Sequence, residues 1–511
     1  MNLFESNAAA LENFQPMLVA ELRKTEPSHH VNLVPVPQNV PAVDVIVVAG
    51  LPTADSWAPL LESRSPYIVV EPSSLGELRT YLSLMNLVKP LGGGVISFAV
   101  GDDGVLQLLN DLFGTLYRRK VTLFGEPGTP AHNAALKSMR FFDTLCAANR
   151  ATLDQFAEDW QRNLSDNIRD FIAGPFLQDQ FGRWKGGKAV IVAAGPSLDE
   201  AQDASAFGGA AVVACDTAAP VLAARGIAPD LIVTLDSSEQ NQTYLNQLPQ
   251  SIYESSILCV TPLVNRQVYA PFRRVLFYSY GHPTLDFFRD CGLGFEPLAS
   301  GGSVALTALD IARTLGVSQA YLLGFDFQSY RFRTHARGTG AALRAMAATN
   351  RLMPVEQYLF NYQSDIESGP AAESPKDTVT DKKFQKWKEW LELYVKTNDD
   401  IKIFQMSAFS ARIAGISMGR PAGESLAQIS ADRRDLNPNV RRDLKFLLKE
   451  IEMALSAQPA DILRRVTTLP RVSKSFSYIL AWLSDKPAAL ASERLRNILD
   501  RFHAGVTAAL E

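Results

Sequence analysis

The residues best suited to chemistry lie in the middle of the chain. His335 stands in the loop sequence YRFRTHARGTG, among arginines and glycines. Histidine is the side chain most easily poised to accept a proton near neutral pH, so His335 is a candidate general base. Asp236 and Asp326 each follow a short apolar run and are carboxylate candidates for the same role. His282 also follows such a run and stays open as a second histidine candidate.

Two small-residue turns predict binding sites for an anion. Gly195, Pro196 and Ser197 follow the apolar run AVIVAA. Glycine lets a ligand approach the backbone, and Ser197 is expected to cap a helix whose N-terminal N–H groups attract phosphate or carboxylate. The second turn comprises Ser300, Gly301, Gly302 and Ser303. It precedes an amphipathic helix, and its glycines can form a nest of N–H donors.

Repeated strand and helix signals around these residues predict an α/β fold. The expected strands are AVIVAA, AAVVAC, DLIVTL, SILCV, VLFYS, QAYLLGF and IKIFQM. Such alternation favours a doubly wound, mostly parallel sheet with helices on both faces. Since ligands of such sheets bind beyond the carboxyl ends of the strands, Asp216, Asp236 and Asp326 are expected at one edge.

The rest of the chain suggests four regions. We expect a smaller α/β domain at 1–130 that starts with a helix over 1–28, a helical bridge at 131–185, and the Rossmann-like central domain at 186–410. Strand signals disappear after about 411, which predicts an all-helical C-terminal domain at 411–511.

Composition excludes several classes of protein. The net charge of −4 and the pI of about 6.0 argue against nucleic acid as the main partner. The four cysteines include no C-x-x-C pair, so the sequence has no zinc-ribbon or thioredoxin-type motif. No apolar run approaches the roughly 20 residues of a membrane span, and the first residues do not resemble a signal peptide. We therefore expect a cytoplasmic protein without a membrane span.

The ordered motifs resemble those of the motility-associated factor (Maf) glycosyltransferases. These motifs are GPSL, then Asp216, GIAPDLIVTLDSS, SGGSVALTALDIARTLGVSQAYLLGFDF and THARGT. The resemblance covers roughly residues 186–416, and the three-part layout is similar as well. It implies transfer of a nonulosonic acid, of the pseudaminic or legionaminic type, from a CMP-activated donor to serine or threonine of flagellin. That activity supports flagellum assembly and motility.

The resemblance also implies roles for individual residues. The central domain of that family is similar to a class of bacterial sialyltransferases. In those enzymes the Gly-Pro-Ser turn and the Ser-Gly motif hold the CMP part of the donor, and tyrosines stabilise the leaving phosphate. The corresponding donor-binding positions are Gly195, Pro196, Ser197, Asp216, Tyr278, Tyr280, Ser300, Gly301, Gly302 and Ser303. No cofactor is certain, a divalent metal held by Asp216, Asp236 and Asp326 is left open, and a flagellin chaperone is a further partner left open.

Two positions depart from the resembling pattern. Ala193 replaces a glycine before the first turn, and the segment PKDTVTDKKFQKWKEW lacks the histidine base of the sialyltransferases. His335, Asp236 or Asp326 must therefore supply any base. Two alternatives stay open. One is a 6-hydroxymethylpterin diphosphokinase-like pyrophosphotransferase, which shares the Gly-Pro-Ser-Leu pattern; the other is a catalytically degenerate flagellar assembly factor.

Overall fold

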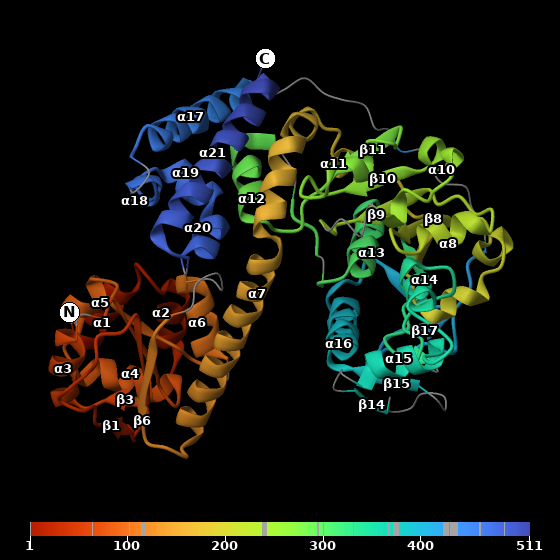
Figure 1. The fold of residues 1–511 in the computed structure, drawn as a ribbon. Coiled ribbons are helices and arrows are strands. Elements are labelled where there is room, and N and C mark those ends of the chain that lie inside the picture. Colours follow the sequence, from red (N-terminus) through yellow and green to blue (C-terminus); the bar gives the residue numbers. More distant parts are fainter. Residues whose placement is uncertain are drawn as a thin grey trace. The chain divides into compact units, whose positions relative to one another are not determined.

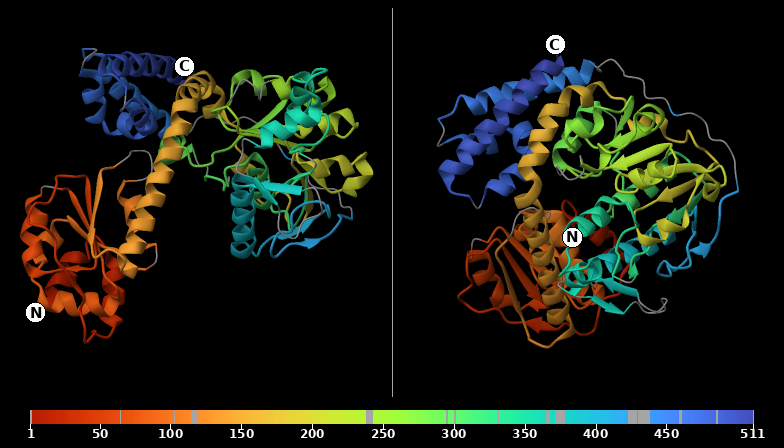
Figure 2. Two further views of the ribbon diagram at one scale, coloured as in Figure 1. Left: turned by 60° about the horizontal axis from the view of Figure 1, so that its bottom comes forward. Right: turned by 45° about the vertical axis from the view of Figure 1, so that its right-hand side comes forward.

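The computed structural model describes most of the chain as two compact units. The described residues are 2–63, 65–101, 103–113, 119–237, 243–293, 296–299, 301–330, 332–364, 368–370, 378–422, 429, 438–458, 461–484 and 486–510. Contacts divide the chain into Met1–Gln155 and Phe156–Glu511. The division falls within one long helix, α7 (Pro130–Ala173), which Figure 2 shows as an uninterrupted ribbon.

The first unit is a small doubly wound α/β domain. Its parallel sheet has the order β5-β4-β2-β6, formed by Ile96–Phe98, Tyr67–Glu71, Val45–Ala49 and Val121–Gly125. The helices are α1 (Leu3–Leu11), α2 (Pro16–Lys24), α3 (Trp57–Glu62), α4 (Leu75–Leu84), α5 (Val88–Gly92) and α6 (Gly104–Phe113). Short strands β1 (Leu33–Val34) and β3 (Leu51–Pro52) pair beside the sheet. The single leading helix predicted over 1–28 is wrong, because Pro16 begins a second helix after a turn.

A large parallel sheet forms the centre of the second unit, and it confirms the predicted Rossmann-like class. Its order is β11-β10-β9-β8-β7-β12-β16-β17. These strands are Arg274–Phe277, Ile257–Val260, Leu231–Thr234, Ala211–Cys215, Lys188–Val192, Gln319–Leu323, Lys402–Gln405 and Ser417–Met418. Figure 1 labels β8, β9, β10 and β11 of this sheet. All neighbouring pairs are parallel. Strand β17 lies beyond residue 411, in the region expected to be wholly helical.

The central strands form because their apolar runs are buried on both faces. All five residues of β8 and all four of β9 are buried, as parallel strands covered by helices should be. The helices of this region are α8 (Ala219–Ala224), α10 (Gln250–Ser255), α11 (Arg266–Tyr269), α12 (Pro283–Phe288), α13 (Val304–Thr314), α14 (Gly340–Ala347), α15 (Val355–Ser364) and α16 (Lys382–Thr397). A small antiparallel sheet joins β13 (Ser329–Tyr330), β15 (Thr378–Asp381) and β14 (Ser368–Pro370).

The C-terminal part of this unit is helical, as predicted. Its helices are α17 (Pro438–Leu455), α18 (Ile462–Thr467), α19 (Pro470–Ser475), α20 (Ser477–Leu483) and α21 (Ala488–Leu510). Helices α19 and α20 pack against α12, which follows strand β11 of the large sheet. The helical segment therefore shares a packed boundary with the sheet domain.

Candidate functional site

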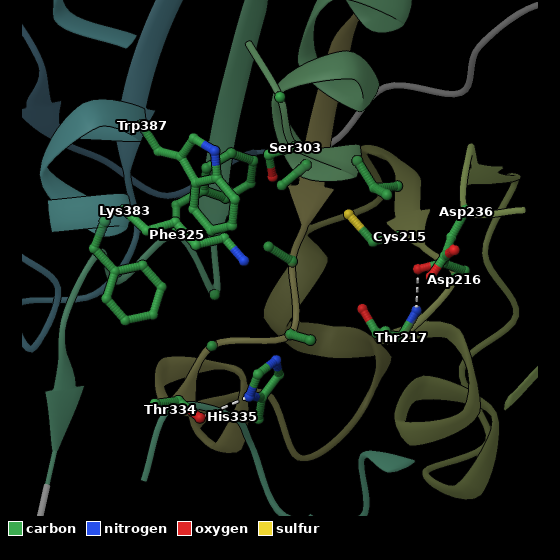
Figure 3. Close-up of a pocket in the computed structure, with 18 of the residues that line it drawn as sticks. Cys215, Asp216, Thr217, Asp236, Ser303, Phe325, Thr334, His335, Lys383 and Trp387 are labelled. Atoms are coloured by element: carbon green, nitrogen blue, oxygen red, sulfur yellow. Dashed lines mark hydrogen bonds between the residues drawn. The ribbon is translucent and has the colours of Figure 1, made fainter. Parts of the chain in front are cut away.

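A cavity of about 640 Å³ opens at the carboxyl edge of the large sheet. Its walls come from the segments after β7, β8, β9 and β12 and from the first turns of α13 and α16. Strand β7 is the first strand of this sheet in the chain, and successive strands extend on one side of it before β12 pairs on the other. Ligands of open parallel sheets bind at such a switch point. We therefore take this cavity as the candidate site (Figure 3).

The structure brings most of the sequence-derived candidates to this cavity. Those that line it are Gly195, Asp216, Asp236, Tyr280, Gly302, Ser303, Asp326 and His335. Pro196, Ser197, Tyr278 and Gly301 are not among the lining residues, and Ser300 lies outside the described residues. The candidates after β7, β8, β9 and β12 therefore converge, as strands of one parallel sheet should make them do.

The Gly-Pro-Ser turn is held by protein groups from a neighbouring strand. The backbone N–H of Ser197 donates to Asp326 Oδ2 at 2.8 Å, and the N–H of Gly324 donates to Ser197 Oγ at 3.0 Å. A Cβ on Gly195 would lie 2.3 Å from Asp326 Oδ2 and 2.4 Å from the Gly324 carbonyl oxygen. Glycine is thus needed at 195 because the segment that follows β12 passes directly against it.

The expectation that Ser197 caps a helix is wrong. Residues Pro196–Glu200 form a 3₁₀ turn without a side-chain cap, and the Ser197 hydroxyl accepts a bond from another segment. The physical reason is that the Asp326 carboxylate takes the position that an N-cap side chain would occupy. Asp326 is only 5% exposed, and burial raises its pKa. Its carboxylate fixes this loop and also contacts the cavity.

The turn before α13 opens toward the cavity. Gly301 and Gly302 have φ values of +52° and +73°, which favour glycine. A Cβ on Gly301 would clash with Leu306 and Trp390, whereas Gly302 and Ser303 line the cavity. Ser303 is the N-cap residue of α13 and makes no side-chain capping bond. Since first-turn N–H groups lack partners within a helix, this N-terminus offers donors to an anion.

Two carboxylates follow adjacent strands on one side of the cavity, as Figure 3 shows for Asp216 and Asp236. Asp216 is 3% exposed and accepts bonds from Thr217 N at 2.6 Å and Thr234 Oγ1 at 2.7 Å. Burial, opposed by those hydrogen bonds and assisted by the charge of Asp236, raises the pKa of Asp216 to about 6. This side of the cavity is therefore better suited to bind the hydroxyl or amide groups of a ligand than its anionic groups.

His335 lies beside Thr334, apart from those two acids (Figure 3), and also lines the cavity. Its Nδ1 is 2.8 Å from Thr334 Oγ1. With the proton on Nδ1, Thr334 accepts it and Nε2 keeps a lone pair for a proton from a ligand. Burial, with smaller effects from the charges of Lys383 and Arg344, lowers the pKa of His335 to about 4. The ring is therefore neutral at physiological pH.

The arginines of the same loop have a different role from the one that their sequence suggests. The composition of this loop, with three arginines and two glycines, predicts a mobile lid over an anionic donor whose arginines keep His335 neutral. Instead Arg333 pairs with Asp199 at 3.0 Å, and Arg337 approaches the same carboxylate at 3.9 Å. Arg331 lies outside the described residues. The loop arginines thus tie this segment to the 3₁₀ turn after β7, because Asp199 lies on that turn.

The two candidate tyrosines differ in position, since one lies in the core and the other lines the cavity. Tyr278 is 3% exposed and donates to the Thr234 carbonyl oxygen at 2.9 Å, so its hydroxyl joins two strand ends in the core. Tyr280 lines the cavity. Burial raises the pKa of Tyr280, so its hydroxyl stays protonated and can donate a hydrogen bond.

Sequence reasoning missed the aromatic walls and one cation. The aromatic residues are Phe156, Trp160, Tyr244, Phe325, Phe327, Phe384 and Trp387, and the cation is Lys383. Lys383 and Trp387 stand four residues apart at the start of α16, so one helix face presents both. This four-residue spacing can be recognised in the sequence. No sequence pattern predicts Trp160 at the cavity, because only the fold brings α7 to this edge of the sheet.

The acidic side chains at the cavity do not gather into a metal site. Across the described ranges, no group of three or more His, Cys, Asp or Glu side chains is placed to share a metal ion. Asp216, Asp236 and Asp326 therefore do not form the three-carboxylate site that the sequence left open. None of the described helices combines the length and hydrophobicity needed to cross a bilayer.

Comparisons with known proteins bear on parts of the chain and on the whole fold. The family described as 6-hydroxymethylpterin diphosphokinase MptE-like matches residues 162–331. A protein of Treponema pallidum (strain Nichols), described as uncharacterized, is 33% identical over an alignment of 138 residues that covers 24% of this chain. The chain covers only 35% of that relative's length.

Two solved structures are similar. A sialyltransferase of Campylobacter jejuni, solved with cytidine-5′-monophosphate, matches 51% of this chain and 98% of its own at 16% identity. Its TM-score of 0.26 is too low to carry an argument. The structure of the MAf glycosyltransferase from Magnetospirillum magneticum AMB-1 matches 99% of this chain and 95% of its own. Its TM-score is 0.58 at 15% identity, so this chain shares the fold of that glycosyltransferase from end to end.

Proposed function

We propose that this protein is a glycosyltransferase that moves a nonulosonic acid from a CMP-activated donor to serine or threonine hydroxyls of flagellin. The observation that carries the proposal is the cavity at the switch point of the large sheet, in a chain whose whole fold matches the MAf glycosyltransferase structure. The N-terminus of α13, a neutral histidine, a lysine and carboxylates that can accept hydrogen bonds from hydroxyl groups all line that cavity.

The polarity of the cavity suggests how the donor lies. Asp216 and Asp236 on one side suit the hydroxyl and amino groups of a nucleoside, which carry hydrogens to donate. The open N-terminus of α13, beside Gly302 and Ser303, suits the phosphate. The cavity volume of about 640 Å³ falls within the usual range for small-molecule sites.

In the proposed reaction the acceptor hydroxyl oxygen attacks the anomeric carbon of the sugar. A new carbon–oxygen bond forms as the bond between that carbon and the phosphate oxygen breaks, and CMP leaves with the electron pair. His335 Nε2 accepts the hydroxyl proton, for which a neutral ring is required. Helix N–H groups of α13 and the protonated hydroxyl of Tyr280 stabilise charge on the leaving phosphate.

A matched pair of assays tests this function. Purified protein is incubated with flagellin and CMP-pseudaminic or CMP-legionaminic acid, and the intact mass of flagellin is measured. Addition of one or more sugar masses, with release of CMP, is the expected outcome. Donor binding without any mass gain would favour the catalytically degenerate assembly factor instead.

A second candidate rests on the match of residues 162–331 to the pterin diphosphokinase-like family. That function requires transfer of pyrophosphate from ATP to a pterin alcohol. Calorimetry with CMP and with ATP plus Mg²⁺ separates the two. Tight CMP binding with weak ATP binding supports the glycosyltransferase, and the reverse result supports the diphosphokinase.

A further inference from the structure

The first turn of α16 forms a wall of the cavity that the proposed reaction has not yet used. Asp381 caps this helix by accepting a hydrogen bond from Phe384 N at 2.7 Å. The cap fixes the turn, so Lys383, Phe384 and Trp387 all face the cavity. The Lys383 ammonium lies 4.6 Å from the centroid of the Trp387 ring. We call this pair of side chains the Lys383–Trp387 corner.

The corner carries the cavity's positive charge. Among the described lining residues Lys383 is the only lysine or arginine, beside the carboxylates Asp216, Asp236, Asp326 and Asp381. Within the described chain Lys383 is paired with the Trp387 ring rather than with a carboxylate. Figure 3 shows the corner on the side of the cavity away from Asp216 and Asp236. An ammonium held in this way is available to an anionic ligand.

The corner adjoins the N-terminus of α13. A Cβ on Gly302 would lie 3.6 Å from Trp387 Nε1, so the indole N–H approaches the glycine turn. Three kinds of donor therefore meet on one wall: the ammonium, the indole N–H and the helix N–H groups. One monoanion would not need all of them, and a ligand with two neighbouring anions would.

We propose that the Lys383–Trp387 corner binds the carboxylate of the transferred sugar while the N-terminus of α13 holds the phosphate. This inference rests on the proposed function. In an activated nonulosonic acid the carboxylate and the phosphate oxygen are attached to the same anomeric carbon, so their binding sites must adjoin. The corner then makes Lys383 a specificity-determining residue that favours acidic over neutral sugars.

Paired affinities of the full-length protein test the assignment. Calorimetry measures CMP and CMP-pseudaminic or CMP-legionaminic acid on the wild type and on Lys383→Met, which keeps an apolar stem and removes the charge. We expect at least about tenfold weaker binding of the CMP-sugar, as for loss of a charged hydrogen bond, and CMP affinity within about threefold. Lys386→Met, on the same helix but not lining the cavity, is the matched control and should change neither affinity.

The remaining outcomes each overturn something specific. Equal loss of both affinities would place Lys383 at the phosphate and overturn the carboxylate assignment alone. Unchanged affinities would remove the corner from the donor site. If the wild type binds neither CMP nor either CMP-sugar, the proposed function fails and the inference fails with it.

Discussion

At the scale of single residues, His335 shows how a fold sets the protonation of a base. Its ring accepts no charge at neutral pH, because burial and the nearby cations lower its pKa to about 4. Such a base is fully available over the physiological range, although its driving force for taking a proton is small. The surrounding donors must therefore supply much of the transition-state stabilisation.

The first prediction concerns turnover. His335→Gln should leave donor affinity within a few-fold and lower the single-turnover rate by at least about 10², since a positioned base is lost. Because protonation of the ring is disfavoured until about pH 4, the wild-type rate should show no acid limb near pH 6.5 from this group. Stopped-flow rates across pH 5–8 test both points. A ring that only orders the loop would instead weaken binding and leave the rate at saturation unchanged.

A second residue-scale prediction uses the raised pKa of Asp216. Its pKa is about 6 in the folded protein against 3.8 for an unperturbed carboxyl, so the folded state holds the proton more tightly. The stability contributed by this proton is complete below pH 3.8 and is lost as pH rises through 6. Asp216→Asn should therefore increase the free energy of unfolding at pH 7.5 by about 1–3 kcal/mol.

Urea unfolding at two pH values checks the sign. The stabilisation by Asp216→Asn should be larger at pH 7.5 than at pH 4.5, while donor binding falls because the negative charge and one of the two acceptor oxygens are lost. Asp203→Asn, at an exposed residue with a lowered pKa, is the control and should not show this pattern. If the Asp216→Asn variant were less stable than the wild type at the higher pH, the burial argument would be contradicted.

At the scale of elements, the junction of β7 and β12 decides the shape of the site. Gly195 has φ −67°, which alanine also adopts, so the only obstacle to a side chain is contact with Asp326 and Gly324. Gly195→Ala should thus destabilise the protein by about 2 kcal/mol or more through overpacking. Chemical denaturation measures this. Gly92→Ala, where an added Cβ meets nothing within 4 Å, should be close to neutral, and equal losses would refute the steric explanation.

This junction also marks the limit of prediction from sequence. The strands were predictable because buried runs such as VVAC and LIVT leave little alternative, and strand ends then placed Asp216 and Asp236. The bond from Ser197 N to Asp326 joins residues 129 positions apart, and no local pattern encodes it. Local sequence rules predict that a serine after Gly-Pro caps a helix. In the structure the carboxylate of Asp326, distant in sequence, accepts the backbone hydrogen bond instead.

At the scale of the whole molecule, contacts divide the chain between Gln155 and Phe156. The predicted boundaries at 130, 185 and 410 remain predictions. All described residues that line the cavity belong to the second unit. Residues 156–511 expressed alone should therefore bind CMP as tightly as the full chain does, measured by calorimetry. A large loss of affinity would show that the first unit contributes to the site.

The opposite truncation should be damaging. A chain that ends at residue 437 lacks α17–α21 and leaves α12 without its partners α19 and α20. Buried Phe288 would lose its contact with Phe502, and Thr284 its bond to Ser475. We expect this variant to aggregate or to melt at a lower temperature than the full chain, as light scattering and calorimetry would show. A variant as stable as the full chain would mean that the tail is an independent appendage.

One buried group links that tail to the cavity. His282 does not line the cavity. Its ring makes edge contacts with Trp160, at 5.4 Å between ring centroids, and with Tyr478 of α20, at 4.4 Å. Trp160 and Tyr478 are themselves 6.3 Å apart, so the three rings form one cluster. Neither nitrogen of His282 has a hydrogen-bond partner in the described structure. Burial lowers its pKa to about 3, so this second histidine candidate acts as an uncharged packing element. Trp160, a member of this cluster, also lines the cavity.

This ring cluster has a thermodynamic consequence. We expect a ligand that restricts Trp160 to restrict Tyr478 as well, because the two rings share this cluster. By linkage, a partner that restricts α20 then changes the affinity for the ligand by the same factor. A protein partner bound to the C-terminal helices would then change the affinity of the cavity for its ligand without contacting that ligand. Ligand binding in the cavity should therefore slow hydrogen exchange in α20.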